Sequence, residues 1–137
     1  MWWIYALLSA VFAALVAIFA KIGIKGVNSD LATAVRTVVI LFIAWGIVLA
    51  RGNTKDLAIL SKENIIFLVL SGIATGLSWI FYFKALSLAD ASKVAPIDKL
   101  SVAFVIILAA IFLRETLTVK TAIGAALIIG GSLVLIL

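Results

Sequence analysis

The chain of 137 residues contains no cysteine and no histidine, has one proline, and only 12% of its residues are charged. Without cysteine there is no disulfide framework and no thiolate chemistry. Without histidine the commonest metal ligand and general base is missing. We therefore expect neither a metal site nor a cofactor. A membrane-embedded enzyme is the least favoured class, because no pair of carboxylates stands at a useful spacing.

Hydrophobic residues make up 66% of the chain, against about 45–50% in a typical soluble domain. A small globule has too little interior to bury so many apolar side chains, so the composition excludes an ordinary soluble protein. The 11 basic residues stand singly between apolar runs and do not form the basic patch of a nucleic-acid-binding protein. We expect no nucleic-acid partner, and a lipid bilayer as the environment.

Five apolar runs are each long enough to cross a bilayer, for which a helix needs about 20 residues. The sequence therefore predicts an all-α, polytopic membrane protein with a single transmembrane domain over residues 1–137. The predicted spans are Trp2 to Phe19, the segment between Asp30 and Arg51, Asn64 to Phe83, Val94 to Leu113, and Val119 to Leu137.

Residues between the runs predict where the helices end. Gly26 suits the left-handed conformation that ends many helices, and it follows the first span. Ser29 or Asp30 is expected to cap the second helix by accepting hydrogen bonds from its free N–H groups. Ser61 and Thr118 are expected to begin the third and fifth helices in the same way.

The basic residues are divided almost equally between the two sides of the membrane. An excess of Lys and Arg in cytoplasmic loops normally sets orientation, so this balance favours dual topology. The expected partner is then a second copy of this chain in an inverted homodimer, and one-way insertion set by a dominant loop is the alternative. The side of the N-terminus carries Arg51, Lys55, Lys62, Arg114 and Lys120, and the other side carries Lys21, Lys25, Arg36, Lys84, Lys93 and Lys99.

Three charged residues fall inside the predicted spans, where ionisable groups are expensive. Arg36 and Lys99 either line a solute pathway or extend their long side chains to the headgroups. Asp98 is a candidate proton carrier, and its alternatives are a structural ion pair or a helix cap. Because consecutive residues do not share a helix face, we expect Asp98 to pair with another helix rather than with Lys99, and Arg36 is nearest in depth.

Ser71, Thr75, Ser78 and Tyr82 follow helical spacing and form one polar stripe on the third span, with Trp79 beside it. Such hydroxyls either hold helices together or line a water-filled cavity. The sequence leaves both interpretations open, and in the second of them these residues belong to the solute pathway.

Small residues and the proline mark two further features. Gly124 and Gly131 are seven residues apart and lie on one face of the fifth helix, which is a candidate dimer contact. Pro96 either lies near a helix start, where proline is tolerated, or belongs to a partly opened helix whose backbone lines the pathway.

Several segments together resemble the drug/metabolite transporter superfamily and its EamA-type repeat. The resemblance covers nearly the whole chain, which is similar to the short subgroup with one five-helix repeat. It implies transport of small metabolites by alternating access, with the last helix of each repeat packed against an inverted copy. The segments are Phe81 to Leu86, Ala95-Pro96, Phe112 to Thr118 and Gly124 to Gly131, with Lys21 and Arg36 at positions that are often basic.

The predicted function is therefore secondary transport of a small-molecule solute in the cell's plasma or inner membrane, by an inverted homodimer. No Walker-type motif is present, so direct use of ATP is not expected, and coupling to protons or another ion is the remaining option. The alternative is a non-transporting membrane subunit or half of a heterodimeric transporter. The three intramembrane charges sum to +1, which favours an anionic or zwitterionic solute over a cation.

Overall fold

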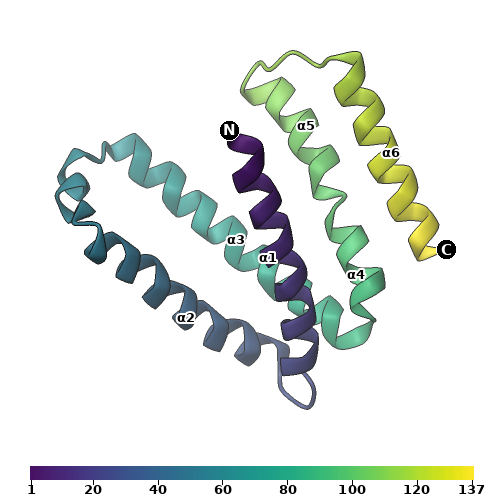
Figure 1. The fold of residues 1–137 in the computed structure, drawn as a ribbon, viewed down its shortest axis with the longest axis horizontal. Helices are drawn as coiled ribbons and strands as arrows, with labels where there is room; N and C mark the ends of the chain where they lie inside the picture. Colours follow the sequence, from purple (N-terminus) through teal and green to yellow (C-terminus); the bar gives the residue numbers. More distant parts are fainter. The chain divides into compact units, whose positions relative to one another are not determined.

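The computed structural model describes residues 1–137 as helices joined by short turns, with no strand. Five segments are long and apolar enough to cross a membrane, so the predicted all-α membrane class is confirmed. The helices are α1 (Trp2–Gly23), α2 (Ser29–Ala50), the 3-10 helix η1 (Asn53–Ile59), α3 (Lys62–Leu88), α4 (Ala91–Asp98), α5 (Ser101–Phe112) and α6 (Val119–Ile136), as Figure 1 shows.

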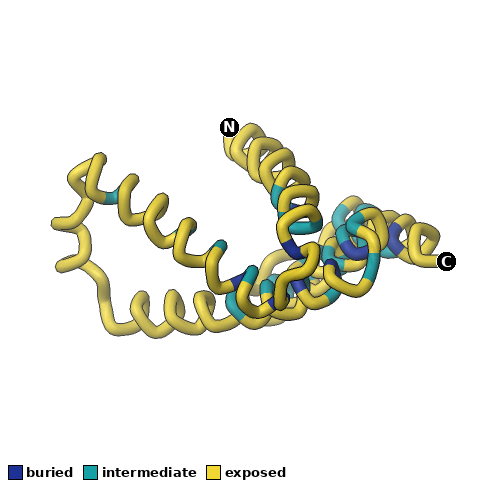
Figure 2. Tube along the Cα trace, turned by 90° about the horizontal axis from the view of Figure 1, so that it is seen from below, coloured by how far each residue is buried: buried dark blue, intermediate teal, exposed yellow.

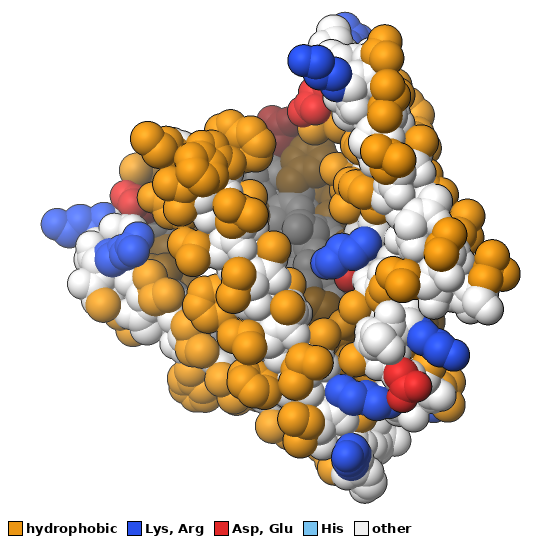
Figure 3. Space-filling model, turned by 45° about the vertical axis from the view of Figure 1, so that its right-hand side comes forward, with side chains coloured by type: hydrophobic (Ala, Val, Ile, Leu, Met, Phe, Trp, Pro, Cys, Tyr) orange, Lys and Arg blue, Asp and Glu red, His pale blue; other side chains and the backbone are white.

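The helix surfaces are apolar and largely exposed. Exposed residues run along almost the whole chain in Figure 2. Hydrophobic side chains cover most of the surface visible in Figure 3. Soluble proteins rarely expose such large apolar surfaces, whereas lipid tails match them. The outer faces of these helices are therefore suited to a bilayer.

The second helix is capped one residue earlier than predicted. The Asn28 side chain accepts hydrogen bonds from the backbone N–H groups of Asp30 (2.8 Å) and Leu31 (3.3 Å). The expectation of Ser29 or Asp30 as the cap is therefore wrong. Ser29 is the first residue of the helix and is buried, and asparagine caps about as well as aspartate or serine.

The other predicted helix ends are confirmed. Gly26 has a φ of 73° in the turn that follows α1. The Ser61 hydroxyl accepts a hydrogen bond from the N–H of Asn64 (3.1 Å) at the start of α3. The Thr118 hydroxyl accepts one from the N–H of Thr121 (3.2 Å) at the start of α6. These ends depend on interactions within three residues, which is why local sequence predicts them.

Residues 20–87 form one compact unit. In this unit α2 and α3 run in opposite directions and are joined through η1, which packs against α2 (Figure 1). The beginning of α2, the end of α3 and the last turn of α1 lie at the same end of this hairpin. At 27 residues α3 is longer than the predicted third span, and it extends by about a turn at its C-terminal end.

Residues 1–19 and 88–137 form the second unit. Here α4 and α5 both pack against α6. The buried positions of these three helices are Val94 on α4, Ala103 on α5 and Ser132 on α6. Small side chains at such positions let helices approach closely in a membrane. The two shorter helices, α4 and α5, therefore pack along the single longer helix α6.

Candidate functional site

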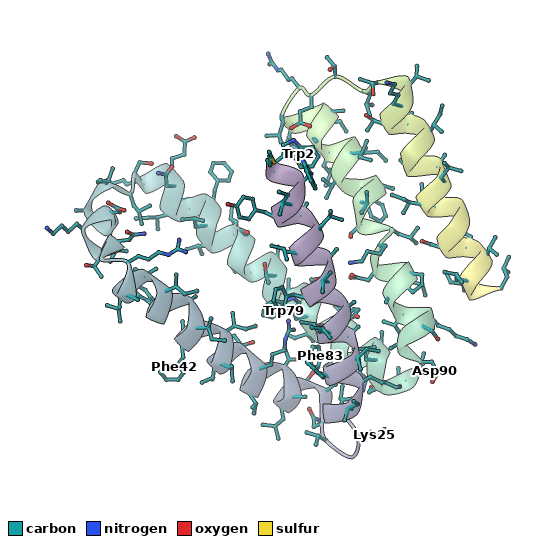
Figure 4. All side chains as sticks on the ribbon, viewed as in Figure 1. Trp2, Lys25, Phe42, Trp79, Phe83 and Asp90 are labelled. Atoms are coloured by element: carbon teal, nitrogen blue, oxygen red, sulfur yellow. The ribbon has the colours of Figure 1, made fainter.

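An arginine lies against aromatic rings at the open end of the α2–α3 hairpin. Arg36, on α2, places its Cζ 4.1 Å from the centroid of the Trp79 ring and 5.2 Å from that of Phe83. Trp79 and Phe83 are one turn apart on α3 and are labelled in Figure 4. A guanidinium at these distances is attracted by the negative ring faces. We call the Trp79 and Phe83 rings the aromatic platform of Arg36.

One ring of the platform is buried. Phe83 is only 2% exposed and Leu86, next along the same face of α3, is fully buried. The Tyr82 and Phe83 rings meet edge to face with their centroids 6.4 Å apart, a favoured geometry for aromatic pairs. The Phe83 ring under Arg36 is therefore packed inside this unit, and the Trp79 ring is half-buried.

A second cation at the same end of the hairpin has a structural partner. Lys21, in the last turn of α1, donates a hydrogen bond from Nζ to the backbone oxygen of Leu86 (2.7 Å). Leu86 lies in the last turn of α3, where carbonyl groups lack helical donors. A charged donor at this negative helix end is favourable, so Lys21 ties the end of α1 to the end of α3.

Hydroxyl groups near Arg36 are used within their own helix. Thr33 donates to the backbone oxygen of Ser29 (2.9 Å) and Thr37 donates to that of Thr33 (2.8 Å). Such bonds to the preceding turn satisfy a hydroxyl in a membrane helix and tend to bend it slightly. Because these two hydroxyls are used within the helix, the Arg36 guanidinium is the strong side-chain donor at this end of α2.

The predicted polar stripe on α3 continues away from the platform. Thr75 donates to the backbone oxygen of Ser71 (2.8 Å), and Ser71, Thr75 and Ser78 are exposed. Trp79 and Tyr82 are half-buried. The arrangement places Arg36 at one end of the stripe, beside its aromatic members.

The fourth predicted span is two helices and not one. α4 contains Pro96 as its sixth residue and ends at Asp98, and α5 begins at Ser101. The N–H groups of Leu100 and Val102 donate to the backbone oxygens of Ile97 and Lys99 (both 3.0 Å). These bonds reach back three residues instead of four, so the helix tightens and changes direction at this point.

Asp98 and Lys99 lie at this break and contact each other. The Lys99 Nζ is 3.6 Å from Oδ2 of Asp98, so the expectation that the two would not pair is wrong. That expectation assumed a continuous helix, in which consecutive side chains diverge, whereas α4 ends at Asp98. Both side chains are partly exposed, and the pair is uncharged overall.

The two glycines predicted for the dimer contact have space around them for a side chain. A Cβ placed at Gly124 or Gly131 meets nothing within 4 Å. Both lie on α6, and Gly131 is exposed beside the buried Ser132. This face of α6 is therefore open to another helix.

Residues 1–137 match the EamA-like transporter family. A protein of Sinorhizobium sp named "uncharacterized transporter in cobO 3'region" is 49% identical over 134 residues, which cover 98% of this chain and 95% of that relative. An uncharacterized protein of Methanocaldococcus jannaschii is 30% identical over 81 residues, covering 59% of each chain. No solved structure matches this chain.

The chain belongs to the EamA-like transporter family, a class of multi-pass membrane protein, as five spans and a full-length match indicate. The predicted resemblance is thereby confirmed. The similarity points to a transporter and not to an enzyme. The Sinorhizobium relative has nearly the same length as this chain.

Sequence reasoning selected Arg36 and Trp79 separately but did not predict their contact. It also missed Phe83, the second ring of the platform, and the bond from Lys21 to Leu86. A signal was present, because Trp79 and Phe83 are four residues apart and so share a helix face. Nothing in the sequence shows which face of α3 turns toward α2.

Proposed function

We propose that this protein is a secondary transporter of small metabolites that works by alternating access as an inverted homodimer in the cell's plasma or inner membrane. The observation that carries the proposal is the break in the fourth span of this family member, between α4 and α5. In many transporters, discontinuous helices form the substrate and ion sites where two inverted repeats meet. This chain supplies one repeat, and a second copy turned over in the membrane supplies the other.

The proposed pathway lies between α1 to α5 of the two copies. On α2 and α3 it includes Arg36 and the stripe residues, and at the break it includes Asp98 and Lys99. Asp98 is the proposed proton carrier, because it is a carboxylate beside an interrupted helix in a membrane span. The open faces of Gly124 and Gly131 on α6 serve assembly of the dimer.

The orientation of each copy provides the decisive test of the inverted dimer. The chain has no cysteine, so Val27→Cys and Thr54→Cys each introduce a single thiol, in the α1–α2 turn and in η1. These positions are exposed and lie on opposite sides of the membrane. With a membrane-impermeant maleimide on intact cells, we expect about half of each variant to be labelled, because the basic residues are balanced.

One-sided labelling would contradict the proposal. If Val27→Cys were labelled completely and Thr54→Cys not at all, or the reverse, every copy would have the same orientation. The alternative function, a non-transporting subunit or half of a heterodimer, would then be favoured. A cysteine-free sample treated in the same way gives the background labelling.

A further inference from the structure

The Arg36 guanidinium has donor groups that are not used inside the chain. It contacts the aromatic platform, interacts electrostatically with Tyr82, and forms no salt bridge within the chain. Attraction to a ring face consumes no N–H donor. A guanidinium carries five donors in a planar fork that matches a carboxylate, so the platform holds a carboxylate-binding group in a fixed position.

We infer that Arg36 on its aromatic platform binds the carboxylate of a solute that carries one negative charge and an apolar body. The inference rests on the proposed transport function and specifies its substrate class. It goes beyond the net charge of the spans, because it assigns the recognition to one side chain and to a bidentate contact.

Neighbouring polar groups do not compete for this role. Lys21 is bonded to the backbone oxygen of Leu86, and the hydroxyls of Thr33 and Thr37 are bonded to the preceding turn of α2. An anion that reaches the aromatic platform therefore meets the Arg36 guanidinium as its donor group. That is the arrangement expected of a recognition point, in which a few placed polar groups fix the orientation of a mostly apolar ligand.

The local charge favours an anion and limits it to a single charge. Basic residues outnumber acidic ones where α1 ends, α2 begins and α3 ends, which attracts anions to this end of the unit. Arg36 is the one cation of this group that lies on the aromatic rings, and a second negative charge would have no partner on the platform, which is poorly hydrated. The charged residues concerned are Lys21, Lys25, Asp30, Arg36 and Lys84.

The depth of Arg36 explains the need for an apolar body. Arg36 is seven residues from the start of α2, which is about 10 Å along a helix. A ligand bound there lies beside Trp79 and beside the apolar side chains of the spans. Burying apolar ligand surface away from water is favourable, which offsets the loss of water around the carboxylate.

Binding of radiolabelled benzoate to the full-length protein in phosphatidylcholine nanodiscs tests this inference. Unlabelled cyclohexanecarboxylate should displace benzoate, and cyclohexanecarboxamide, which has the same shape without the charge, should do so at least tenfold less well. Phthalate and inorganic phosphate should also be weak competitors. Equal displacement by acid and amide would overturn the inference without any variant, so the result does not depend on how a mutant folds.

Substitutions then assign the contact to Arg36. Arg36→Gln should weaken benzoate binding at least tenfold. Arg36→Lys should lose part of the affinity, because an ammonium keeps the charge but not the bidentate geometry. Arg51→Gln is the matched control, since Arg51 ends the same helix at its other end, and it should bind like the parent. Unchanged binding by Arg36→Gln would overturn the inference.

A lipid phosphate is the rival partner for Arg36, and Trp79 can report on it. In the variant W2F/W3F/W45F, Trp79 is the remaining tryptophan. We expect benzoate to change its emission in phosphatidylcholine nanodiscs. If only phosphatidylglycerol changed it, and benzoate did not compete, Arg36 would be a lipid anchor and the inference would be wrong.

The two proposals fail in different ways. Saturable binding of benzoate through Arg36 together with one-sided thiol labelling would contradict the inverted dimer and leave the binding site standing. Two-sided labelling without carboxylate binding would leave the dimer standing and overturn the binding site.

Discussion

At the scale of single residues, Lys21 and Arg36 have different roles within the unit of residues 20–87. Lys21 joins the ends of two helices through a backbone oxygen, whereas Arg36 rests on aromatic rings with its donors free. Isolated charges are costly in a membrane, so each must gain from contacts that compensate for lost water. For Lys21 the compensating contact is its hydrogen bond to Leu86, which joins two helices. For Arg36 the aromatic rings provide part of the compensation, and its N–H donors stay available for a ligand.

The prediction at the scale of single residues concerns Asp98 and proton coupling. If it is the proton carrier, Asp98→Asn should lower proton-coupled uptake at least tenfold, because an amide cannot release a proton. Proteoliposomes with entrapped pyranine would measure internal pH while a panel of small monocarboxylates and amino acids is added outside. Asp90→Asn is the matched control, because the Asp90 side chain makes no capping bond at the start of α4. Normal proton movement in Asp98→Asn would remove Asp98 from the coupling mechanism.

At the scale of elements, the fourth span is the irregular one. Pro96 has no N–H to donate to the preceding turn of α4, and the backbone changes to bonds that reach back three residues soon after it. The other spans are continuous helices of 18 to 27 residues. A break at membrane depth is tolerated only where protein or water covers the backbone, which points to the α4–α5 junction as a place of contact or passage.

Restoring the missing donor should stabilise this span and slow its movement. Proline in a helix interior costs about 3 kcal/mol relative to alanine, so Pro96→Ala should raise the free energy of unfolding by up to about this amount. The thermal midpoint, followed by tryptophan emission in detergent, should rise while the initial uptake rate falls. Ser92→Ala, also on α4, should change neither. Faster uptake by Pro96→Ala would contradict the view that the break assists transport.

At the scale of the whole molecule, the proposed inverted dimer depends on how the chain enters the membrane. Five basic residues against six leave little preference for either orientation. A relative that is 49% identical has nearly the same length as this chain. A single repeat with balanced charges suits an assembly in which the two copies have opposite orientations.

Shifting this balance should separate the two orientations. Asn53→Lys with Thr54→Lys adds basic residues to one side, and Val27→Lys with Ser92→Lys adds them to the other. Each double variant alone should insert one way and lose uptake, because the inverted partner is missing. Co-expression of both should restore uptake, as measured in membrane vesicles. Full uptake by either variant alone would show that an inverted pair is not required.

The sequence alone predicts the helices and many of their ends because these depend on local interactions. Apolar runs of membrane length predict the five spans, and capping groups within three residues predict the starts at Ser61 and Thr118. The prediction fails where neighbours compete. The sequence suggested Ser29 or Asp30 as the cap, and only the backbone conformation shows that the neighbouring Asn28 has the extended geometry of a cap.

The contacts between helices were decided only by the tertiary structure. Helical spacing places Trp79 and Phe83 on one face of α3, but it does not say that this face meets Arg36. The pairing of Asp98 with Lys99 likewise depends on a helix end that periodicity does not reveal. In a chain this uniformly apolar, hydrophobicity marks no inner face, so the choice among faces comes from packing and from the partners of a few polar groups.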